Sequence, residues 1–345
     1  MSHQIGVLGA GTWGTALARM LSNTGNSVTV WSPLEREVIG LSSRRAHPNL
    51  PGAAIPEDIV FTTDIRAACR EKYILLFAVP SPFVRETAGK AAPFVPEGQL
   101  IVDAAKGIEP GTLFSMTEMI ADELRKSGRT ARLAALSGPT HAEEVALDMP
   151  TTIVAASSDP GTAGQVQDVF MNTCMRVYTN TDLRGVELCG ALKNIIALAA
   201  GISRGLGYGD NTKAAIITRG LAEMTRLGCA MGCVEQTFTG LAGLGDLIVT
   251  ATSVHSRNNR CGELIGRGLK PKEAVERVGM VVEGINAVPA AMELSGRYGI
   301  EMPIVQAVDA VLNHGAAPAD AVKQLMGRVK RQERSGPYMD GAENY

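Results

Sequence analysis

The sequence has few of the residues that mark metal-binding or disulfide-bonded proteins. Only six of its 345 residues are cysteine, and the closest pair, Cys229 and Cys233, has three residues between its members. This is not the two-residue spacing of C-x-x-C redox and zinc motifs. The five histidines lie in unrelated segments, without the spacing of metal ligands. We therefore expect reduced, mostly buried thiols in a cytoplasmic protein, and no metal site.

A strongly basic region is also missing. Lysine and arginine number 33 against 35 aspartates and glutamates, for a formal net charge of -2. The densest basic stretch, Arg328 to Arg334, is interrupted by Glu333, which is typical of the solvated end of a helix. The chain therefore lacks the cationic surface that nucleic-acid binding requires.

Long apolar runs are the third absence. Met1 to Leu34 carries only Arg19 as a formal charge, but it has no basic leader, and polar residues interrupt it. We find no segment with the roughly 20 predominantly apolar residues of a membrane helix. The protein is predicted to be soluble, without membrane insertion.

What is present is a change of pattern near residue 182. Residues 1–181 alternate β-rich runs with helical stretches such as Thr112 to Lys126, which predicts an α/β, Rossmann-like doubly wound parallel sheet with helices on both faces. Residues 182–334 predict an all-α C-terminal domain, and 335–345 a frayed tail. The expected strands are Ile5–Leu8, Val28–Trp31, Ile59–Thr62, Tyr73–Val79, Leu100–Asp103, Leu133–Leu136, Thr152–Ala155 and Arg176–Tyr178. The expected helices after 182 are Val186–Ser203, Thr212–Leu227, Arg257–Gly266, Pro271–Val278, Ile285–Tyr298 and Ile304–Asn313.

A glycine turn follows the first expected strand. Gly9, Gly11 and Gly14 have the G-x-G-x-x-G spacing and precede the apolar stretch Ala16 to Leu21. In such turns the first glycine permits the tight bend, the second lets the backbone approach a pyrophosphate, and the third lets helix and strand pack closely. The anion binds at the helix N-terminus. This context favours dinucleotide binding over a turn that binds nothing.

The choice between NAD and NADP depends on the end of the second strand. An acidic residue there binds the ribose hydroxyls of NAD, yet Val30 to Pro33 contains none. Arg36, Arg44 and Arg45 lie just downstream and are candidates to bind a 2′-phosphate. The cofactor is therefore predicted to be NADP or NAD, with NADPH slightly favoured. Arginines that only face solvent are the alternative.

Two segments are expected at the carboxyl edge of the sheet, where α/β proteins bind ligands. Val79 to Pro82 is a turn after the fourth strand, and Lys106 follows the fifth. A lysine at this edge can stabilise an oxygen that gains negative charge. The alternative for Lys106 is a solvated surface side chain.

Lys193 is the only formal charge between Glu187 and Arg204, in a run that otherwise predicts a buried helix. The run offers Lys193 no carboxylate three or four positions away. Burial lowers the pKa of such an amine below its usual value of about 10.4, so that it can exchange protons with a substrate. The alternative is a stem that lies along apolar surface while the ammonium reaches water.

Asp246, like Lys193, is a charged residue without a local partner, because it is a carboxylate in an apolar, glycine-rich run. An ion pair between Lys193 and Asp246 would give each of them a partner, in a catalytic or a purely structural role. Polar groups also occur in Leu136 to Ala142 and in His255 to Arg260. Ser256, Arg257 and Asn258 of the latter segment are candidates to bind a phosphate, with a polar N-cap and surface arginines as the alternative.

Together these segments resemble the NAD(P)-dependent glycerol-3-phosphate dehydrogenases of the soluble bacterial type, over Ile5 to about Arg334. The most specific match runs from Gly190-Ala-Leu-Lys-Asn-Ile-Ile-Ala197 through Gly205-Leu-Gly-Tyr-Gly-Asp-Asn-Thr-Lys213. Supporting matches are Gly9 to Gly14, Lys106-Gly107, Gly138-Pro139-Thr140, Gly243 to Asp246, Ser256-Arg257-Asn258 and Val281 to Gly284.

The resemblance implies an oxidoreductase that reduces dihydroxyacetone phosphate to sn-glycerol 3-phosphate with NAD(P)H, and a part in phospholipid precursor synthesis. Hydride passes to the ketone carbon, and Lys193 exchanges the proton. The residues implied around the reacting oxygen are Lys193, Asn194, Lys106, Asp246 and Thr250. Those implied for the phosphorylated substrate are Lys106, Gly138, Thr140, Ser256, Arg257 and Asn258. Those implied for the cofactor are Gly9, Gly11, Thr12, Trp13, Gly14, Lys106, Ala142, Arg257, Val281 and Glu283.

Two departures from the family pattern stand out. Arg204 replaces a usual acid, and Ser32-Pro33 replaces a basic or histidine-containing turn. The alternatives to this function are another two-domain dehydrogenase, of hydroxy-acid or ketopantoate type, and a nicotinamide-binding sensor without chemistry. A homodimer is compatible with the sequence, which does not determine the oligomeric state.

Overall fold

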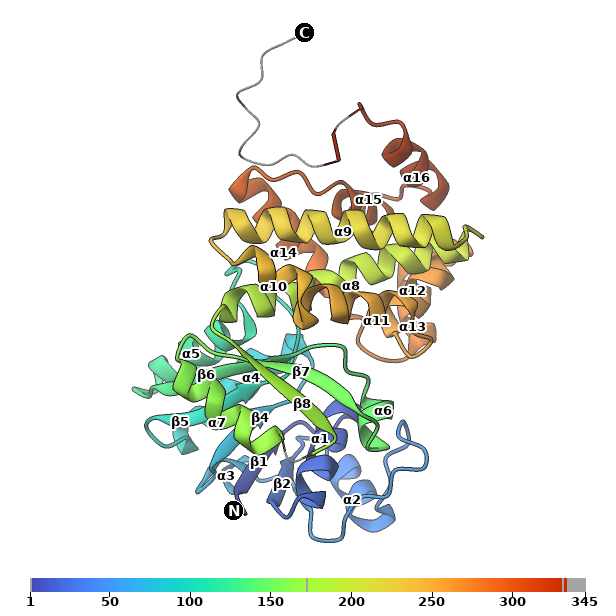
Figure 1. Ribbon diagram of the computed structural model, residues 1–345. Helices are drawn as coiled ribbons and strands as arrows, with labels where there is room; N and C mark the ends of the chain where they lie inside the picture. The colour runs from blue at the N-terminus through green and yellow to red at the C-terminus, as the bar shows by residue number, and fades with distance from the viewer. Residues whose placement is uncertain (1, 172, 331, 334–345) are drawn as a thin grey trace.

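The computed structural model describes residues 2–171, 173–330 and 332–333. A sheet with flanking helices forms the blue to green half of the chain, and a helical half in yellow to red stands beside it (Figure 1). The sheet has eight strands in the order β3-β2-β1-β4-β5-β6-β7-β8. The predicted frayed tail lies outside the described residues. The strands are β1 (Gln4–Leu8), β2 (Ser27–Trp31), β3 (Val60–Thr62), β4 (Ile74–Phe77), β5 (Gln99–Asp103), β6 (Ala131–Ser137), β7 (Thr151–Ala156) and β8 (Met175–Asn180).

All eight predicted strands are present, but the expectation of a wholly parallel sheet is wrong at one position. β7 runs antiparallel to β6, with Ser137 opposite Val154, whereas the other neighbouring pairs are parallel. A parallel pair needs a long crossover, usually through a helix, to return the chain to the starting edge. The connection from β6 to β7 contains only the five-residue helix α6 (Ala142–Ala146), so the chain turns back directly.

The sheet is buried on both faces because its strands are apolar at successive positions. Ile74 and Leu76 of β4 pack in one apolar cluster, while Leu75 and Phe77 pack in another. The further helices of this half are α1 (Thr12–Asn23), α2 (Glu35–Arg44), α3 (Ile65–Cys69), α4 (Val84–Ala91), α5 (Met116–Lys126) and α7 (Pro160–Phe170). Helices therefore cover both faces, as predicted.

The helix expected from Thr112 begins later, at Met116, because Ser115 caps it. The Ser115 hydroxyl accepts from the backbone amide of Glu118, whose carboxylate accepts from the Ser115 amide. This capping box stops the helix from extending toward the N-terminus.

The helical half is built around α8 (Leu183–Gly205), which lies against most of its other helices. The other helices of this half are α9 (Asp210–Ala230), α10 (Glu235–Thr239), α11 (Asp246–Thr252), α12 (Arg257–Gly266), α13 (Pro271–Val278), α14 (Glu283–Tyr298), α15 (Pro303–Asn313) and α16 (Pro318–Met326). The expected helices are all present; α10, α11 and α16 were not predicted. A π-helical turn, Leu241–Gly245, leads into α11.

Helices α8 and α12 touch through their backbones. A Cβ atom added at Gly201 would lie 2.1 Å from the carbonyl oxygen of Asn259, and one added at Gly262 would lie 2.1 Å from that of Leu198. Only glycine fits at such contacts. These contacts fix the position of α8 relative to α12, and with it the relative positions of the polar residues on the two helices.

Helix α8 also corrects the expectation that the chain has no segment fit to cross a membrane. Among the described residues, it is long and apolar enough to do so by length and composition. Every residue in its most apolar window is buried inside the protein, so its composition is that of a core helix. Such a core imposes the same apolar composition as a bilayer does.

Candidate active site

Two lysines from different halves of the protein share one buried carboxylate. Lys193 Nζ on α8 donates to Asp246 Oδ1 at 2.5 Å and to Thr250 Oγ1 at 2.6 Å. Lys106 Nζ, beyond the end of β5, donates to Asp246 Oδ2 at 2.6 Å. Asp246 and Thr250 lie four residues apart on α11, so their side chains share one helix face. The Lys193–Asp246 ion pair expected from the sequence is therefore present, and Lys106 joins it.

Both lysines are removed from bulk water. The side chain of Lys193 is 6% exposed and that of Lys106 is 18% exposed. The alternatives are therefore wrong: Lys193 does not extend its ammonium into solvent, and Lys106 is not a solvated surface residue. In both cases Asp246 holds the ammonium inside the protein.

Burial and neighbouring charges shift the pKa values of this cluster. Burial lowers the pKa of Lys193 to about 7; Asp246 opposes this shift, and the positive charge of Lys106 adds to it. Burial alone would raise the pKa of Asp246, but the two lysines outweigh it and hold that pKa below its usual value. The cluster thus contains an amine that gains and loses its proton near neutral pH.

Asn194 and Asn258 connect the neighbouring helices. Asn258 Nδ2 donates to Asn194 Oδ1 at 2.9 Å, and Asn258 Oδ1 accepts from the Gly284 amide at 2.8 Å. Both ends of the Asn258 side chain are therefore engaged inside the protein. The expected contact of Asn258 with the substrate phosphate stays a prediction.

Ser256 and Arg257 begin α12 but differ in what their side chains do. The Ser256 hydroxyl accepts from the Asn259 amide at 3.2 Å, so the N-cap interpretation holds for Ser256. Within the described part of the chain, the Arg257 guanidinium makes no hydrogen bond or ion pair. Arg257 is therefore the side chain of this segment that remains available for a ligand.

The loop after β6 meets the segment before α12. Gly138 has φ +155°, and a Cβ there would lie 3.0 Å from the carbonyl oxygen of Thr152. Thr140 Oγ1 donates to the Gly138 carbonyl at 3.2 Å. The rings of His141 and His255 lie 5.8 Å apart between centroids. Sequence reasoning gave neither histidine a role, because no sequence signal links these two distant segments.

The glycine turn has the shape that a pyrophosphate requires. Gly9 has φ +120°, and a Cβ there would lie 2.8 Å from the backbone of Ala78. A Cβ at Gly14 would lie 2.0 Å from the Gly9 carbonyl oxygen, whereas one at Gly11 would meet nothing within 4 Å. The open space thus lies at Gly11, the N-cap of α1. The three glycines fit the roles that the dinucleotide motif gives them.

Other residues expected at the cofactor come from several elements. Thr12 Oγ1 accepts from Asn49 Nδ2 at 3.2 Å, and Trp13 and Ala142 pack against an apolar cluster of the sheet half. Val281 is partly buried. Glu283 accepts from the amide and the hydroxyl of Ser81, at 3.0 and 2.5 Å, in the turn after β4. This contact joins α14 to the carboxyl edge of the sheet, which is where the sequence predicts this turn.

One of the three arginines expected near a 2′-phosphate is engaged elsewhere. Arg45 donates to the carbonyls of Pro56 and Ile59 and pairs with Glu57. Arg44 donates from Nε to the Gly40 carbonyl of its own helix at 3.3 Å, and both Arg36 and Arg44 are exposed. The slight preference for NADPH thus loses the support of Arg45. For Arg45, the solvent-facing alternative is also wrong.

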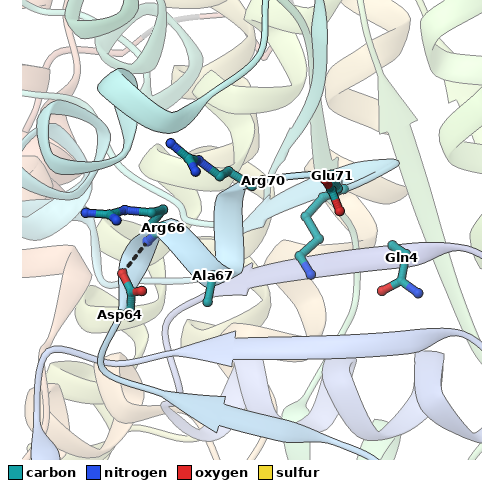
Figure 2. Close-up of a pocket in the computed structure, with 7 residues that line it drawn as sticks. Gln4, Asp64, Arg66, Ala67, Arg70 and Glu71 are labelled. Carbon is teal, nitrogen blue, oxygen red and sulfur yellow. Dashed lines mark hydrogen bonds between the residues drawn. The ribbon is translucent and has the colours of Figure 1, made fainter.

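The protein also has a surface hollow of about 510 Å³, whose lining residues Figure 2 shows. Gln4, which begins β1, and α3 contribute to its lining. Because the glycine turn follows the opposite end of β1, the hollow lies at the other edge of the sheet. It is not the candidate active site.

Comparison with known families matches both halves of the chain. The model described as NAD-dependent glycerol-3-phosphate dehydrogenase N-terminus matches residues 4–163, and the one described as its C-terminus matches 182–323. The chain belongs to the NAD-dependent glycerol-3-phosphate dehydrogenase family. No group of His, Cys, Asp and Glu among the described residues has the arrangement of a metal site.

Individual members of this family are similar over nearly the whole chain. Glycerol-3-phosphate dehydrogenase [NAD(P)+] 2 of Lactobacillus delbrueckii subsp. bulgaricus is 63% identical over 96% of this chain and 98% of its own length. The enzyme named glycerol-3-phosphate dehydrogenase [NAD(P)+] of Shouchella clausii is 49% identical over 97% and 99%. The crystal structure of glycerol-3-phosphate dehydrogenase from Coxiella burnetii, 37% identical, superposes with a TM-score of 0.90 and covers 95% of this chain and 99% of that one.

Proposed function

We propose that this chain reduces dihydroxyacetone phosphate to sn-glycerol 3-phosphate with NADH or NADPH. The family and the names of its relatives support this reaction over a ketopantoate-type dehydrogenase or a sensor. The observation that carries the proposal is the buried Lys193, paired with Asp246 at 2.5 Å and with its pKa lowered by burial to about 7.

The glycine turn and its surroundings are the proposed dinucleotide site. Gly9, Gly11 and Gly14 place the N-terminus of α1 where its amides and dipole attract a pyrophosphate. When bound, NAD(P)H supplies the hydride for the ketone carbon. The other residues that we propose at this site are Thr12, Trp13, Lys106, Ala142, Arg257, Val281 and Glu283.

Lys193 is the proposed proton donor for the reduction. Asp246 and Thr250 hold its Nζ atom, and the protonated amine gives its proton to the oxygen that becomes the alkoxide. The Lys106 ammonium beside it stabilises the developing negative charge. Asn194 completes the surroundings of the reacting oxygen. In the reverse reaction, neutral Lys193 accepts the proton.

The phosphate of the substrate is proposed to bind at the start of α12. The amides of the first helical turn and the Arg257 guanidinium favour a dianion there. Ser256 and Asn258 position this turn, since their side chains bond to Asn259, Asn194 and Gly284. Gly138 and Thr140 are proposed to contact the substrate from the sheet half.

An absorbance assay tests the reaction. The purified protein is expected to oxidise NADH or NADPH when dihydroxyacetone phosphate is added, and to leave the nicotinamide band unchanged with ketopantoate. Faster oxidation with ketopantoate would favour the second type of dehydrogenase. No oxidation with any ketone, despite cofactor binding, would favour a sensor.

We also propose that the chain divides into a dinucleotide-binding domain, 1–181, and a helical catalytic domain, 182–334. The end of β8 at Asn180 and the start of α8 at Leu183 support this division. A cytoplasmic location is supported by six free cysteines, because reducing compartments keep thiols unpaired.

A further inference from the structure

The end of β2 lies directly beside the glycine turn. The Gly9 amide donates to the Trp31 carbonyl at 2.9 Å, and the amide of the next residue, Ser32, donates to the Thr62 carbonyl at 3.1 Å. Ser32 therefore continues the sheet edge by one residue. In dinucleotide-binding folds this is the place where the adenosine ribose is bound.

Ser32 binds the carboxylate of Glu37, a residue that lies outside strand β2. Its hydroxyl donates to Glu37 Oε2 at 2.5 Å and accepts from the Leu34 amide at 3.2 Å. Ser32 is 1% exposed, whereas Glu37 is half-buried in the first turn of α2. The second oxygen, Oε1, makes no hydrogen bond among the described residues. One carboxylate oxygen is thus fixed and the other is available.

The arginines downstream of Ser32 differ in how far they are engaged. Arg45 donates to two backbone carbonyls, whereas Arg44 uses only its Nε atom, for a carbonyl of its own helix, and Arg36 is exposed. His47 is a neighbour of Glu37, and burial lowers its pKa although Glu37 opposes the shift. His47 Nδ1 accepts from the Asn49 amide at 3.1 Å. A neutral imidazole with one nitrogen already used offers little to a phosphate.

We propose that Glu37, oriented by Ser32, makes this enzyme prefer NAD(H) over NADP(H). Its free oxygen accepts a hydrogen bond from the ribose 2′-hydroxyl, and its charge repels a 2′-phosphate. Glu37 thus supplies the carboxylate that usually comes from an acidic residue at the end of the second strand. This reverses the slight preference for NADPH expected from the sequence alone.

Binding of the oxidised cofactors, measured without substrate, tests the proposal. The protein is titrated with NAD+ and NADP+, and dissociation constants are taken from the shift in melting temperature. The unaltered protein is expected to bind NAD+ roughly tenfold or more tightly than NADP+. Glu37→Gln should reduce the ratio of the NADP+ and NAD+ dissociation constants about tenfold, mainly through tighter NADP+ binding. Ser32→Ala should reduce this ratio less, because Glu37 keeps its charge but loses the hydrogen bond that orients it.

Glu35→Gln is the matched control. Glu35 is exposed in the same helical turn, so this variant removes the same charge without touching Ser32. It should leave the binding ratio unchanged. Equal effects of the two glutamate variants, or an unaltered protein that binds NADP+ as tightly as NAD+, would overturn the proposal. Loss of NADP+ binding in Arg36→Ala would then identify Arg36 as the phosphate ligand. Because no substrate is present, a wrong ketone assignment would not affect these results.

Discussion

Lys193 and Lys106 donate to opposite oxygens of the same carboxylate, that of Asp246. When Lys193 is protonated, two positive charges thus share one negative charge, and the cluster carries an excess positive charge in a buried place. A ligand oxygen that becomes negative during reaction would be stabilised by this excess. Within the described part of the chain, Asp246 is the residue that accepts hydrogen bonds from both ammonium groups, so it helps to set the position of each.

Removal of the Lys193 amine is expected to stop proton transfer while leaving the cofactor site intact. Lys193→Ala should lower kcat by roughly 100-fold or more, with the dissociation constant for NAD+ changed little. Steady-state assays and a cofactor titration measure the two effects. Lys126→Ala, at an exposed lysine on α5, is the control. Turnover close to that of the control would contradict the role of Lys193.

The pH dependence should follow the protonation of Lys193. Reduction needs the charged amine, so its rate should fall as the pH rises through about 7. Oxidation needs the neutral amine, so its rate should rise over the same range. Two other titratable groups, Lys106 and His141, also interact electrostatically with Lys193.

The substitution Asp246→Asn tests which group controls this pH dependence. It removes the charge that raises the pKa of Lys193, so the midpoint of the reduction profile should move to lower pH. Initial rates from pH 5 to 9 in both directions check the shift. A midpoint that stays in place would show that another group controls the profile.

Arg257 should distinguish a phosphorylated ketone from an unphosphorylated one. Arg257→Ala removes a side chain suited to two charge-assisted hydrogen bonds, so the KM for dihydroxyacetone phosphate should rise about tenfold or more. With saturating cofactor, the kcat/KM for dihydroxyacetone should fall much less. Arg260→Ala, at an exposed position in the same helix, should leave both values unchanged. Equal losses for both ketones would argue against a phosphate contact.

The contact between α8 and α12 should tolerate no added methyl group. Gly201→Ala places a carbon against the Asn259 carbonyl, which should destabilise the protein by about 1–3 kcal/mol and lower its Tm by several degrees. Gly296 lies inside α14, and a Cβ there meets nothing within 4 Å. Gly296→Ala should therefore be neutral or raise the Tm slightly. Thermal denaturation measures both, and an equal effect would contradict the packing argument.

Much of the fold could be predicted because burial determines composition. Runs such as Ile74 to Phe77 are apolar on both faces, and this pattern identifies a central strand. The direction of β7 could not be predicted, because strand composition contains no information on chain direction. It follows instead from the short α6 connection. The start of α5 depends on one hydrogen-bonded cap at Ser115, which helical periodicity does not show.

The site was predictable where a residue was out of place in its own segment. Lys193 and Asp246 are each a charge in an apolar run, and the need for a partner led to their pairing. Lys106 gave no such signal, because a lysine after a strand is common at the surface. Glu37 was missed since the expected acid belongs on the strand itself, whereas the carboxylate reaches Ser32 from five residues downstream.

The glycine contacts between α8 and α12 have a consequence for substrate selection. One helix carries the proposed proton donor, Lys193, and the other begins with the proposed phosphate ligand, Arg257. Because backbone meets backbone at Gly201 and Gly262, neither helix can slide along the other without a main-chain clash. The main-chain positions of Lys193 and Arg257 are therefore fixed relative to each other, and only their side chains can adapt to the length of a substrate.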